Sequence, residues 1–199
     1  MIEVINYEGK TEEELLSKIN EEEYIYKIEE IPGKLFKGKK YTLKAIKRED
    51  VKNYIKDFIK NLASAMNITI NVEIRFKDDC YYVSLISPDN TSILIGKEGR
   101  TINSIQLLLH QALNINTGFN IRINVDSSNY KVNKEKNLER EIRKICKEVI
   151  SSKIDVKLDP MNSYDRRIVH NIVGEFKNLE SESFSEEPTR YVKITYKED

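Results

Sequence analysis

The feature that most constrains the fold is an abrupt change of hydrophobic period in the middle of the chain. From Val51 to Met66, apolar residues recur at intervals of three and four, the spacing of an amphipathic helix. From Ile68 to Phe76, apolar residues occupy every second position and polar residues the others, as in a strand with one solvent-exposed face. A helix followed directly by such a strand predicts helices packed on small sheets, an α+β fold, with Asp50 as the helix cap.

The same alternation continues through the middle of the chain. A turn at Asp78 and Asp79 leads to a predicted strand over residues 81–87, and residues 121–125 form another alternating segment. Two glycines and a helix lie between these strands. The apolar face of that helix consists of Ile102, Ile105, Leu109 and Leu113. The predicted order of this part, with a helix on either side of the glycines, is α-β-β-α-α-β.

The beginning of the chain shows a separate, smaller pattern. Residues 2–4 predict a strand, and a capping box at Thr11 predicts a helix from there to about Asn20. Two further strands are expected near residues 24–28 and 41–43. They are separated by the breakers Pro32, Gly33 and Gly38. The prediction for this segment is therefore β-α-β-β.

The last part of the chain begins with a long helix over about residues 128–151, which is charged outside one apolar line. A short strand near residues 156–158 follows. Asn162 then caps a second helix, with Asp165 in its first turn. Residues 190–196 predict a terminal strand, so this part is expected to pack helices on a small sheet.

These patterns divide the chain into three small predicted domains, residues 1–49, 50–127 and 128–199. The chain carries 33 basic and 33 acidic residues, so any site for a polyanion must be local. Cys80 and Cys146 form no disulfide framework, which favours a reducing cytosol. We expect a cytoplasmic protein that does not span a membrane, because no signal-like stretch or long apolar run occurs.

The sequence LIGKEGRTINSI contains the first candidate site. Gly96 and Gly99 lie between an apolar run and a helix. Glycine at the mouth of a helix lets the backbone approach a sugar-phosphate chain, and the N–H groups of the helix then face an anion. The candidate binding residues are Ile95, Gly96, Lys97, Glu98, Gly99 and Arg100. A plain helix-turn-helix is the alternative for so short a motif.

A second candidate site lies on the helix after Asn162. Arg166 and His170 are four residues apart and therefore share one helix face, beside Ser163 and at the edge of the apolar stripe. Spacing alone leaves two interpretations open: a binding pair, or a solvated flank with a histidine packed by its ring.

The residues around the glycines resemble the signature of the KH domain, (V/I)-I-G-x-x-G-x-x-I-x-x-I. Every fixed position matches except the first, where Leu94 stands. The order of elements resembles the bacterial, type II form of that domain. This resemblance implies a module that clamps about four nucleotides of single-stranded RNA or DNA, with the glycine loop on the backbone. Glu98 departs from the family, which commonly has a neutral or basic residue there, and its carboxylate repels phosphates.

A resemblance to the R-3-H domain, a module that binds single-stranded nucleic acids, is carried by the stretches LDPMNSYDRRIVHNIV and SESFSEEPTRYVKI. Arg166 and His170 fall on its two defining positions. Arg167, Pro188 and Arg190 fit the pattern of one bacterial family, Jag, also called KhpB. In that family a small N-terminal domain, a KH domain and an R-3-H domain follow in this order. The resemblance covers most of the chain, although the long acidic linker common in the family is missing before the KH-like part.

The resemblance implies a cytoplasmic single-stranded RNA-binding protein, a post-transcriptional regulator linked to cell elongation or division, with no catalytic role, cofactor or metal. The implied partners are a small single-KH protein, through KH–KH contact, and a YidC-type membrane insertase. The sequence does not decide between RNA and single-stranded DNA. The alternative is a protein-interaction adaptor that has weak or lost RNA affinity. A nuclease is the third class, but His110 and His170 lie in different predicted domains and no acidic metal pattern accompanies them.

Overall fold

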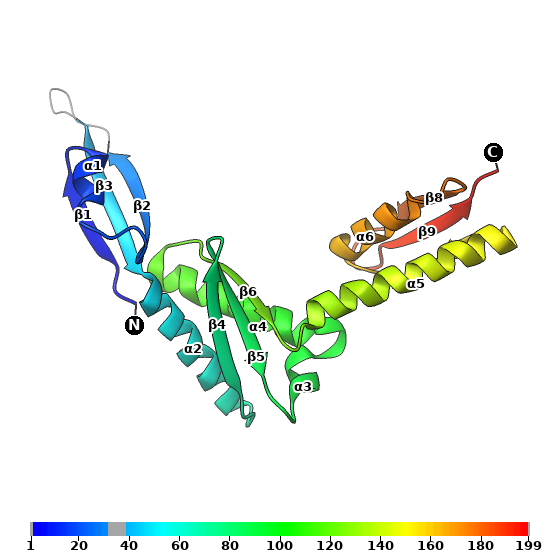
Figure 1. Ribbon diagram of the computed structural model, residues 1–199, viewed down its shortest axis with the longest axis horizontal. Coiled ribbons are helices and arrows are strands. Elements are labelled where there is room, and N and C mark those ends of the chain that lie inside the picture. Colours follow the sequence, from blue (N-terminus) through cyan, green and yellow to red (C-terminus); the bar gives the residue numbers. More distant parts are fainter. Residues whose placement is uncertain (1, 32–38, 199) are drawn as a thin grey trace. The chain divides into compact units, whose positions relative to one another are not determined.

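The computed structural model describes residues 2–31 and 39–198 and confirms the α+β class (Figure 1). The chain forms two compact units, Met1–Ser128 and Asn129–Asp199. The described strands form three sheets of three strands each. The breakers predicted at Pro32, Gly33 and Gly38 lie outside the described residues. The three-domain division with boundaries at residues 49 and 127 stays a prediction.

The first sheet has the predicted β-α-β-β order. It contains β1 (Ile5–Gly9), β2 (Tyr24–Ile31) and β3 (Lys40–Lys47), paired antiparallel in the order β1-β3-β2, with α1 (Glu12–Leu16) between the first two strands. The buried core under α1 consists of Leu15, Leu43 and Ala45.

Two boundaries in this part differ from the sequence prediction. The strand begins at Ile5 instead of within residues 2–4, and α1 ends at Leu16, short of Asn20. The helix ends early because the amides of Lys18 and Ile19 each donate to the carbonyl three residues back, which tightens the chain into a turn.

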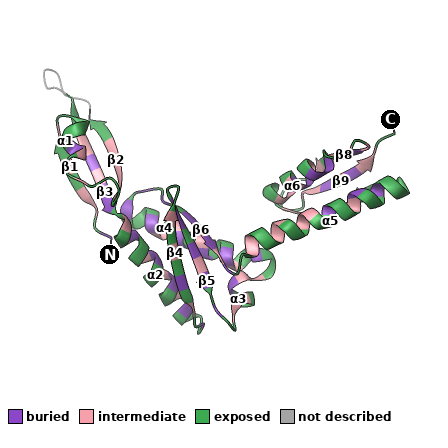
Figure 2. Cartoon of the chain, viewed as in Figure 1, coloured by how far each residue is buried: buried purple, intermediate pink, exposed green. Residues whose placement is uncertain are grey.

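The second sheet has the predicted α-β-β-α-α-β order. Its elements are α2 (Arg48–Ala65), β4 (Asn71–Lys77), β5 (Cys80–Ile86), α3 (Thr91–Ile95), the short 3-10 turn η1 (Lys97–Gly99), α4 (Arg100–Thr117) and β6 (Arg122–Asp126). The strand order is β4-β5-β6, antiparallel and then parallel. Figure 2 shows buried residues of α2, α4 and the strands interleaved with exposed ones, as expected when helices cover one face of a sheet.

The cap predicted at Asp50 is wrong. Helix α2 begins at Arg48, whose amide donates to the carbonyl of Glu23 at 2.8 Å, so the turn before β2 satisfies this first amide. Asp50 and Glu49 instead lie inside that turn, where their carboxylates complement the positive end of the helix dipole.

The second unit packs two helices on one sheet. It contains α5 (Tyr130–Ser152), β7 (Val156–Lys157), α6 (Ser163–Val173), β8 (Leu179–Phe184) and β9 (Tyr191–Tyr196), with the antiparallel strand order β7-β9-β8. Both helices contribute to one core. The central residues of that core are Ile142, Cys146, Val149, Val169, Ile172, Val173, Val192 and Ile194. As predicted, the Asn162 side chain caps α6 by accepting from the Asp165 amide at 2.9 Å.

Strand β8 has no counterpart in the sequence prediction. Its inward positions are Leu179, Ser181 and Ser183, and two of these three are polar, so the hydrophobic alternation of a strand is absent. No helix in the described part of the chain is long and apolar enough to cross a membrane.

Candidate nucleic-acid interface

The turn between α3 and α4 requires glycine at two positions. Gly96 has φ of 71° and Gly99 has φ of 80°, both in the left-handed region that side chains disfavour. A Cβ atom at Gly96 would lie 2.2 Å from Thr101 Oγ1 and 2.9 Å from the Thr101 backbone nitrogen. A side chain at Gly96 is therefore excluded twice, by backbone angle and by collision.

Helix α4 begins without a side-chain cap. Its N-cap residue is Gly99, which has no side chain to accept from the first amides of the helix. The helix runs for 18 residues, and it is anchored by the buried side chains of Ile102 and Ile105, while Leu94 is buried just before the turn. The amides of Gly99 and Arg100 donate to the carbonyls of Gly96 and Lys97, and the firmly packed helix directs the positive end of its dipole at the turn.

The side chains on this turn are exposed and of both signs. Lys97, Glu98 and Arg100 are all exposed, whereas Ile95 is half-buried. The Glu98 carboxylate lies 3.6 Å from the Arg100 guanidinium, and both side chains are more than half exposed, so water screens this pair. Glu98, which is predicted to repel phosphates, thus also pairs with Arg100, one of the two cations that attract them.

In the second unit, Arg166 is buried instead of lying on a solvated flank. Its side chain is only 10% exposed, and its Nη1 donates to the Met161 carbonyl at 2.8 Å and to a Glu187 carboxylate oxygen at 2.7 Å. Met161 in turn donates its amide to the Arg190 carbonyl at 3.0 Å. These contacts connect the start of α6 to the segment between β8 and β9.

His170 joins α6 to β8 through two hydroxyl groups. Its Nδ1 lies 2.7 Å from Ser181 Oγ and its Nε2 lies 2.8 Å from Ser183 Oγ. Burial, followed by the charge of Arg166, lowers the pKa of the imidazole, so the neutral ring is favoured. The two inward serines that hide β8 from sequence analysis are therefore the partners of this histidine.

The remaining predicted residues of this unit are more accessible. Ser163 and Arg167 are exposed on α6, and Arg190 is half-buried next to β9. The Nε atom of Arg190 is buried and has no hydrogen-bond partner among the described residues. Arg166 thus contacts the β8–β9 connection, which also carries Arg190, whereas His170 contacts β8 itself and Arg167 is exposed on α6.

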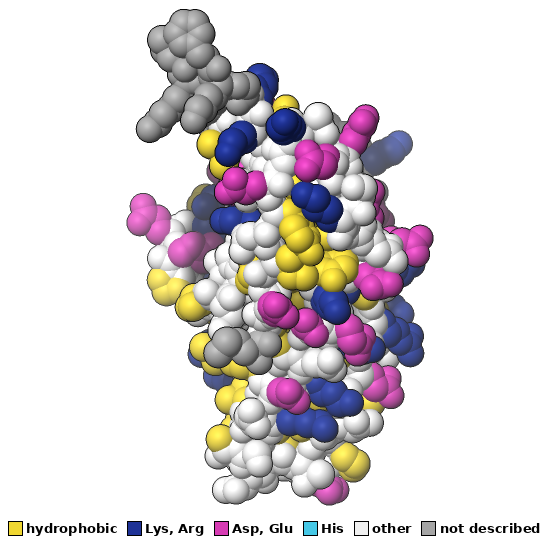
Figure 3. All heavy atoms as spheres, turned by 90° about the vertical axis from the view of Figure 1, so that its left-hand side faces the viewer, with side chains coloured by type: hydrophobic (Ala, Val, Ile, Leu, Met, Phe, Trp, Pro, Cys, Tyr) yellow, Lys and Arg dark blue, Asp and Glu magenta, His cyan; other side chains and the backbone are white. Residues whose placement is uncertain are grey.

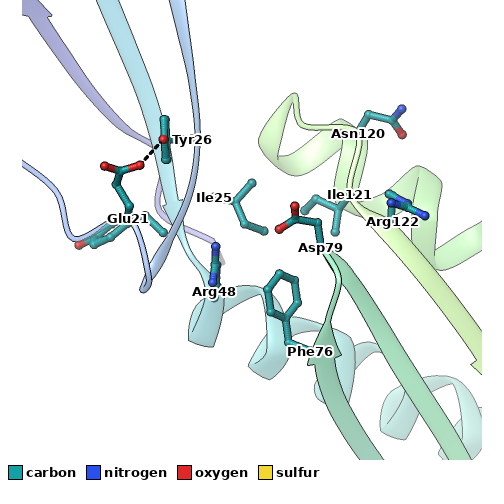
Figure 4. Close-up of a pocket in the computed structure, with 10 residues that line it drawn as sticks. Glu21, Ile25, Tyr26, Arg48, Phe76, Asp79, Asn120, Ile121 and Arg122 are labelled. Carbon is teal, nitrogen blue, oxygen red and sulfur yellow. Dashed lines mark hydrogen bonds between the residues drawn. The ribbon is translucent and has the colours of Figure 1, made fainter. Parts of the chain in front are cut away.

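Sequence reasoning missed a pocket in the first unit. A cavity of about 420 Å³ lies between the first sheet and the β4–β5 turn, with Ile25, Phe76, Asp79 and Arg48 among its lining residues (Figure 4). The Arg48 guanidinium lies 4.7 Å from the centre of the Phe76 ring, a cation–π contact. No sequence signal marks this pocket, because its walls come from four segments far apart in the chain.

Charges of both signs are mixed on the surface. On the face drawn in Figure 3, Lys and Arg side chains alternate with Asp and Glu side chains. This mixture agrees with the equal numbers of basic and acidic residues and leaves recognition to local sites.

In a comparison with known proteins, family models match the two parts of the chain that contain the candidate sites. A model of the KhpA/KhpB KH domain matches residues 52–125, and a model of the R-3-H domain matches residues 136–196. A protein named RNA-binding protein KhpB from Clostridium symbiosum is 28% identical over 208 residues, covering 100% of this chain and 94% of that protein. A protein of the same name from Bacillus subtilis (strain 168) is 26% identical over 167 residues, covering 82% and 79%.

The fold and the two matched models define a protein in which a KH domain precedes an R-3-H domain. The chain thus carries a KH domain of the KhpA/KhpB type and an R-3-H domain, and it is similar along its whole length to a protein named RNA-binding protein KhpB.

Proposed function

We propose that this chain is a cytoplasmic, non-catalytic protein that binds single-stranded RNA at the Gly96–Gly99 turn and along the accessible side of α6. The observation that carries the proposal is the two-glycine turn in front of the N-terminus of α4, which has no side-chain cap. The names of the relatives, RNA-binding protein KhpB, support the same ligand class.

At the glycine turn, the backbone does most of the binding. A phosphate at this turn lies beside the half-buried Gly96 and the exposed Lys97, in front of the N-terminus of α4. Gly99 is buried, and Thr101 occupies the space that a Cβ of Gly96 would take. The helix N-terminus supplies roughly half an elementary positive charge, and Lys97 adds a full one beside it. The bases of the strand then lie over the apolar groove of the KH domain.

In the second unit, we assign direct contact to the accessible side chains. Arg167 and Ser163 offer a guanidinium and a hydroxyl to the phosphate backbone, because both are exposed on α6. Arg166 holds the β8–β9 connection through Glu187, and His170 holds β8 through Ser181 and Ser183, so this pair positions the segments next to the strand. Arg190 lies on that connection with an unsatisfied Nε donor.

Two modest sites on one chain bind more tightly than either alone. Once the KH turn holds a strand, the second module meets the next nucleotides at a raised effective concentration, without any new contact. A regulator of this kind needs no net positive charge, which is consistent with a formal net charge of zero. We place its role in post-transcriptional control of cell elongation or division.

A small KH-domain protein is the proposed partner. Helix α4 exposes the apolar residues Leu107, Leu108 and Ile115, the last of them 83% exposed. Leu108 and Ile115 are seven residues apart and share one face of the helix, so they offer an apolar stripe for a second KH domain. Association with a YidC-type membrane insertase rests on the family resemblance alone.

The KH site is tested by replacing both exposed residues of the turn, Lys97→Asp with Glu98→Asp. The fold should remain, because both side chains point into solvent, while two acids in front of the helix repel phosphate. We expect the affinity for a labelled single-stranded RNA, measured by fluorescence anisotropy, to fall at least tenfold with an unchanged melting temperature. Unchanged affinity would refute this site, and the same titration with single-stranded DNA decides between the two nucleic acids.

A protein-interaction adaptor is the second candidate function. The Glu98–Arg100 pair and the exposed apolar stripe on α4 favour it, because one weakens phosphate binding and the other suits a protein. Titration at two salt concentrations separates the two functions. Phosphate contacts give a log–log slope of roughly −0.7 per phosphate neutralised, whereas a flat or absent response supports the adaptor.

A further inference from the structure

The β4-β5-β6 sheet has one face that its helices leave open. Helices α2 and α4 pack against the inward residues, such as Val72, Val83 and Val125, and Figure 1 shows the strands in front of α4. The alternate residues of the strands point the other way. The residues of this outer face are Asn71, Glu73, Arg75, Lys77, Cys80, Tyr82, Ser84, Ile86, Arg122, Asn124 and Asp126.

Strand register arranges this outer face in rows across the sheet. One row contains Arg75, Tyr82 and Asn124, and the next contains Lys77, Cys80 and Arg122. Tyr82 on the central strand is therefore flanked by an arginine on one side and an amide on the other. In the neighbouring row, two cations flank the buried thiol of Cys80.

The aromatic ring and the cations of these rows are accessible. Tyr82 is 43% exposed, although it lies on the middle strand of the sheet. Within residues 2–31 and 39–198, neither Arg75 nor Arg122 forms an ion pair, and both are exposed. The Lys77 ammonium lies 3.9 Å from an Asp78 carboxylate, but both side chains are 77% exposed, so this attraction is weak.

We propose that this outer face is a second contact surface for single-stranded RNA, separate from the glycine turn; the inference rests on the proposed function. One base stacks on the Tyr82 ring, because every base offers a flat face to an aromatic side chain. The adjacent phosphate lies over Cys80, between Lys77 and Arg122, which are two strand spacings or roughly 10 Å apart and long enough to reach it together.

Side chains beside the ring complete this contact. Arg75 meets the phosphate on the other side of the stacked base or packs its guanidinium plane beside it. Asn124 lies on the other side of the ring and has its own interaction within the protein. An aromatic ring surrounded by cations and an amide suits a base with its phosphates, whereas an apolar protein segment would leave three charges to be desolvated.

The acidic groups on this face limit the contact. Glu73 and Asp126 form the next row, on either side of Ser84, and they repel a strand that continues in that direction. Asp78 and Asp79 lie at the turn beyond Lys77. The favourable area thus holds about one nucleotide and its two phosphates, since stacking sites take one base per ring.

The ring is tested with two variants of one residue. Tyr82→Phe keeps the aromatic face, and Tyr82→Leu keeps an apolar side chain without it. With a labelled RNA of about 12 nucleotides, longer than the roughly four that a KH groove holds, we expect Tyr82→Leu to bind roughly tenfold more weakly and Tyr82→Phe to bind like the wild type. Equal affinities of the two variants overturn the proposal, and circular dichroism melting checks that both fold.

The cations are tested through salt dependence. Lys77→Gln with Arg122→Gln should flatten the log–log salt slope by roughly 0.7 for each phosphate that the variant no longer neutralises. The matched control is Lys56→Gln with Lys60→Gln, which removes the same charge from the exposed side of α2 and should leave the slope unchanged. Equal slopes for the two double variants overturn the proposal.

A separate readout locates the strand. Ultraviolet crosslinking of the wild-type protein to RNA, followed by mass spectrometry, should recover the peptide that contains Tyr82. If RNA binds and crosslinks only at the glycine turn, the second surface is wrong while the proposed function stands. If the wild-type chain binds no RNA, the proposed function fails and this surface fails with it.

Discussion

The glycine turn of the first unit and the Arg166–His170 pair of the second place their motif residues in opposite environments. The turn at Gly96 contains two glycines and precedes a helix end without a side-chain cap. The charged side chains beside it are exposed to solvent. Around Arg166 the chain buries the side chain and gives both motif residues protein partners. The glycine motif thus forms an exposed turn at a helix end. The Arg166–His170 motif instead holds together the segments that form its surface.

The largest expected effect breaks the turn. Gly96→Ala must place a Cβ against Thr101 and also hold φ near 71°, so we expect a loss of RNA affinity above tenfold and a lower melting temperature. Gly118→Ala is the matched control, because Gly118 has φ of 70° but no atom within 4 Å of its added Cβ. The control should cost only the left-handed penalty, about 1–2 kcal/mol, and leave RNA affinity intact. If the two variants lower RNA affinity and melting temperature equally, the collision with Thr101 is not the cause of the loss.

The next effect separates two neighbouring arginines. Arg166→Ala removes hydrogen bonds to the Met161 carbonyl and the Glu187 carboxylate, and we expect it to lower the free energy of unfolding of the second unit by about 2 kcal/mol. Arg167→Ala removes an exposed charge and should leave that free energy unchanged while weakening RNA binding and flattening its salt dependence. Urea denaturation and anisotropy measure the two quantities. If Arg166→Ala weakens RNA binding but leaves the free energy of unfolding unchanged, the hydrogen bonds of Arg166 do not stabilise the fold.

The third prediction concerns pH. The pKa of His170 is lowered from 6.5, so below that value the unfolded chain takes up a proton that the folded ring resists. The stability of the second unit should therefore be full above about pH 6.5 and fall as pH falls, by at most about 1.4 kcal/mol per pH unit.

Two variants isolate this effect by comparing melting temperatures at pH 7.5 and pH 5.5. His170→Gln has no group that titrates in this range, so its melting temperature should change less with pH than that of the wild type. His110→Gln removes the other histidine of the chain and is measured at the same two pH values. A wild-type pH dependence that survives in His170→Gln would contradict the assignment.

The smallest predicted change in RNA affinity comes from the acidic residue of the glycine turn. Glu98→Gln removes a carboxylate close to the phosphate path and frees Arg100 from its 3.6 Å partner. Removing one unit charge about 6 Å from a phosphate in water is worth roughly 0.7 kcal/mol, so RNA should bind about threefold more tightly. The measurement is the dissociation constant at low salt, and the gain should shrink as salt is raised. A weaker complex would mean that Glu98 itself contacts the strand.

Most of the fold was predictable where burial follows a period. The alternation from Ile68 and the helical spacing from Val51 predicted the sheet and helices of the middle part, because each buries one face. Strand β8 escaped prediction because Ser181 and Ser183 replace its apolar residues in order to meet His170.

The assignment of the site residues to nucleic-acid binding stays a prediction, and the sequence did not predict the environments in which these residues lie. The pattern of glycines indicated an open turn, because left-handed angles and close approach are properties of the local chain. The burial of Arg166 depends on Glu187, 21 residues further along, and no local pattern contains that contact. The row of Arg75, Tyr82 and Asn124 likewise exists only after three strands pair in register.

The central claim is that the glycine turn and the N-terminus of α4 bind the phosphates of an unpaired strand. The most direct test is to titrate the isotope-labelled chain with single-stranded RNA and follow each backbone amide by nuclear magnetic resonance. We predict that the amides from Gly96 to Thr101 shift most and that these shifts are lost in the variant with aspartate at positions 97 and 98. Saturable RNA binding that leaves those amides unshifted would contradict the account.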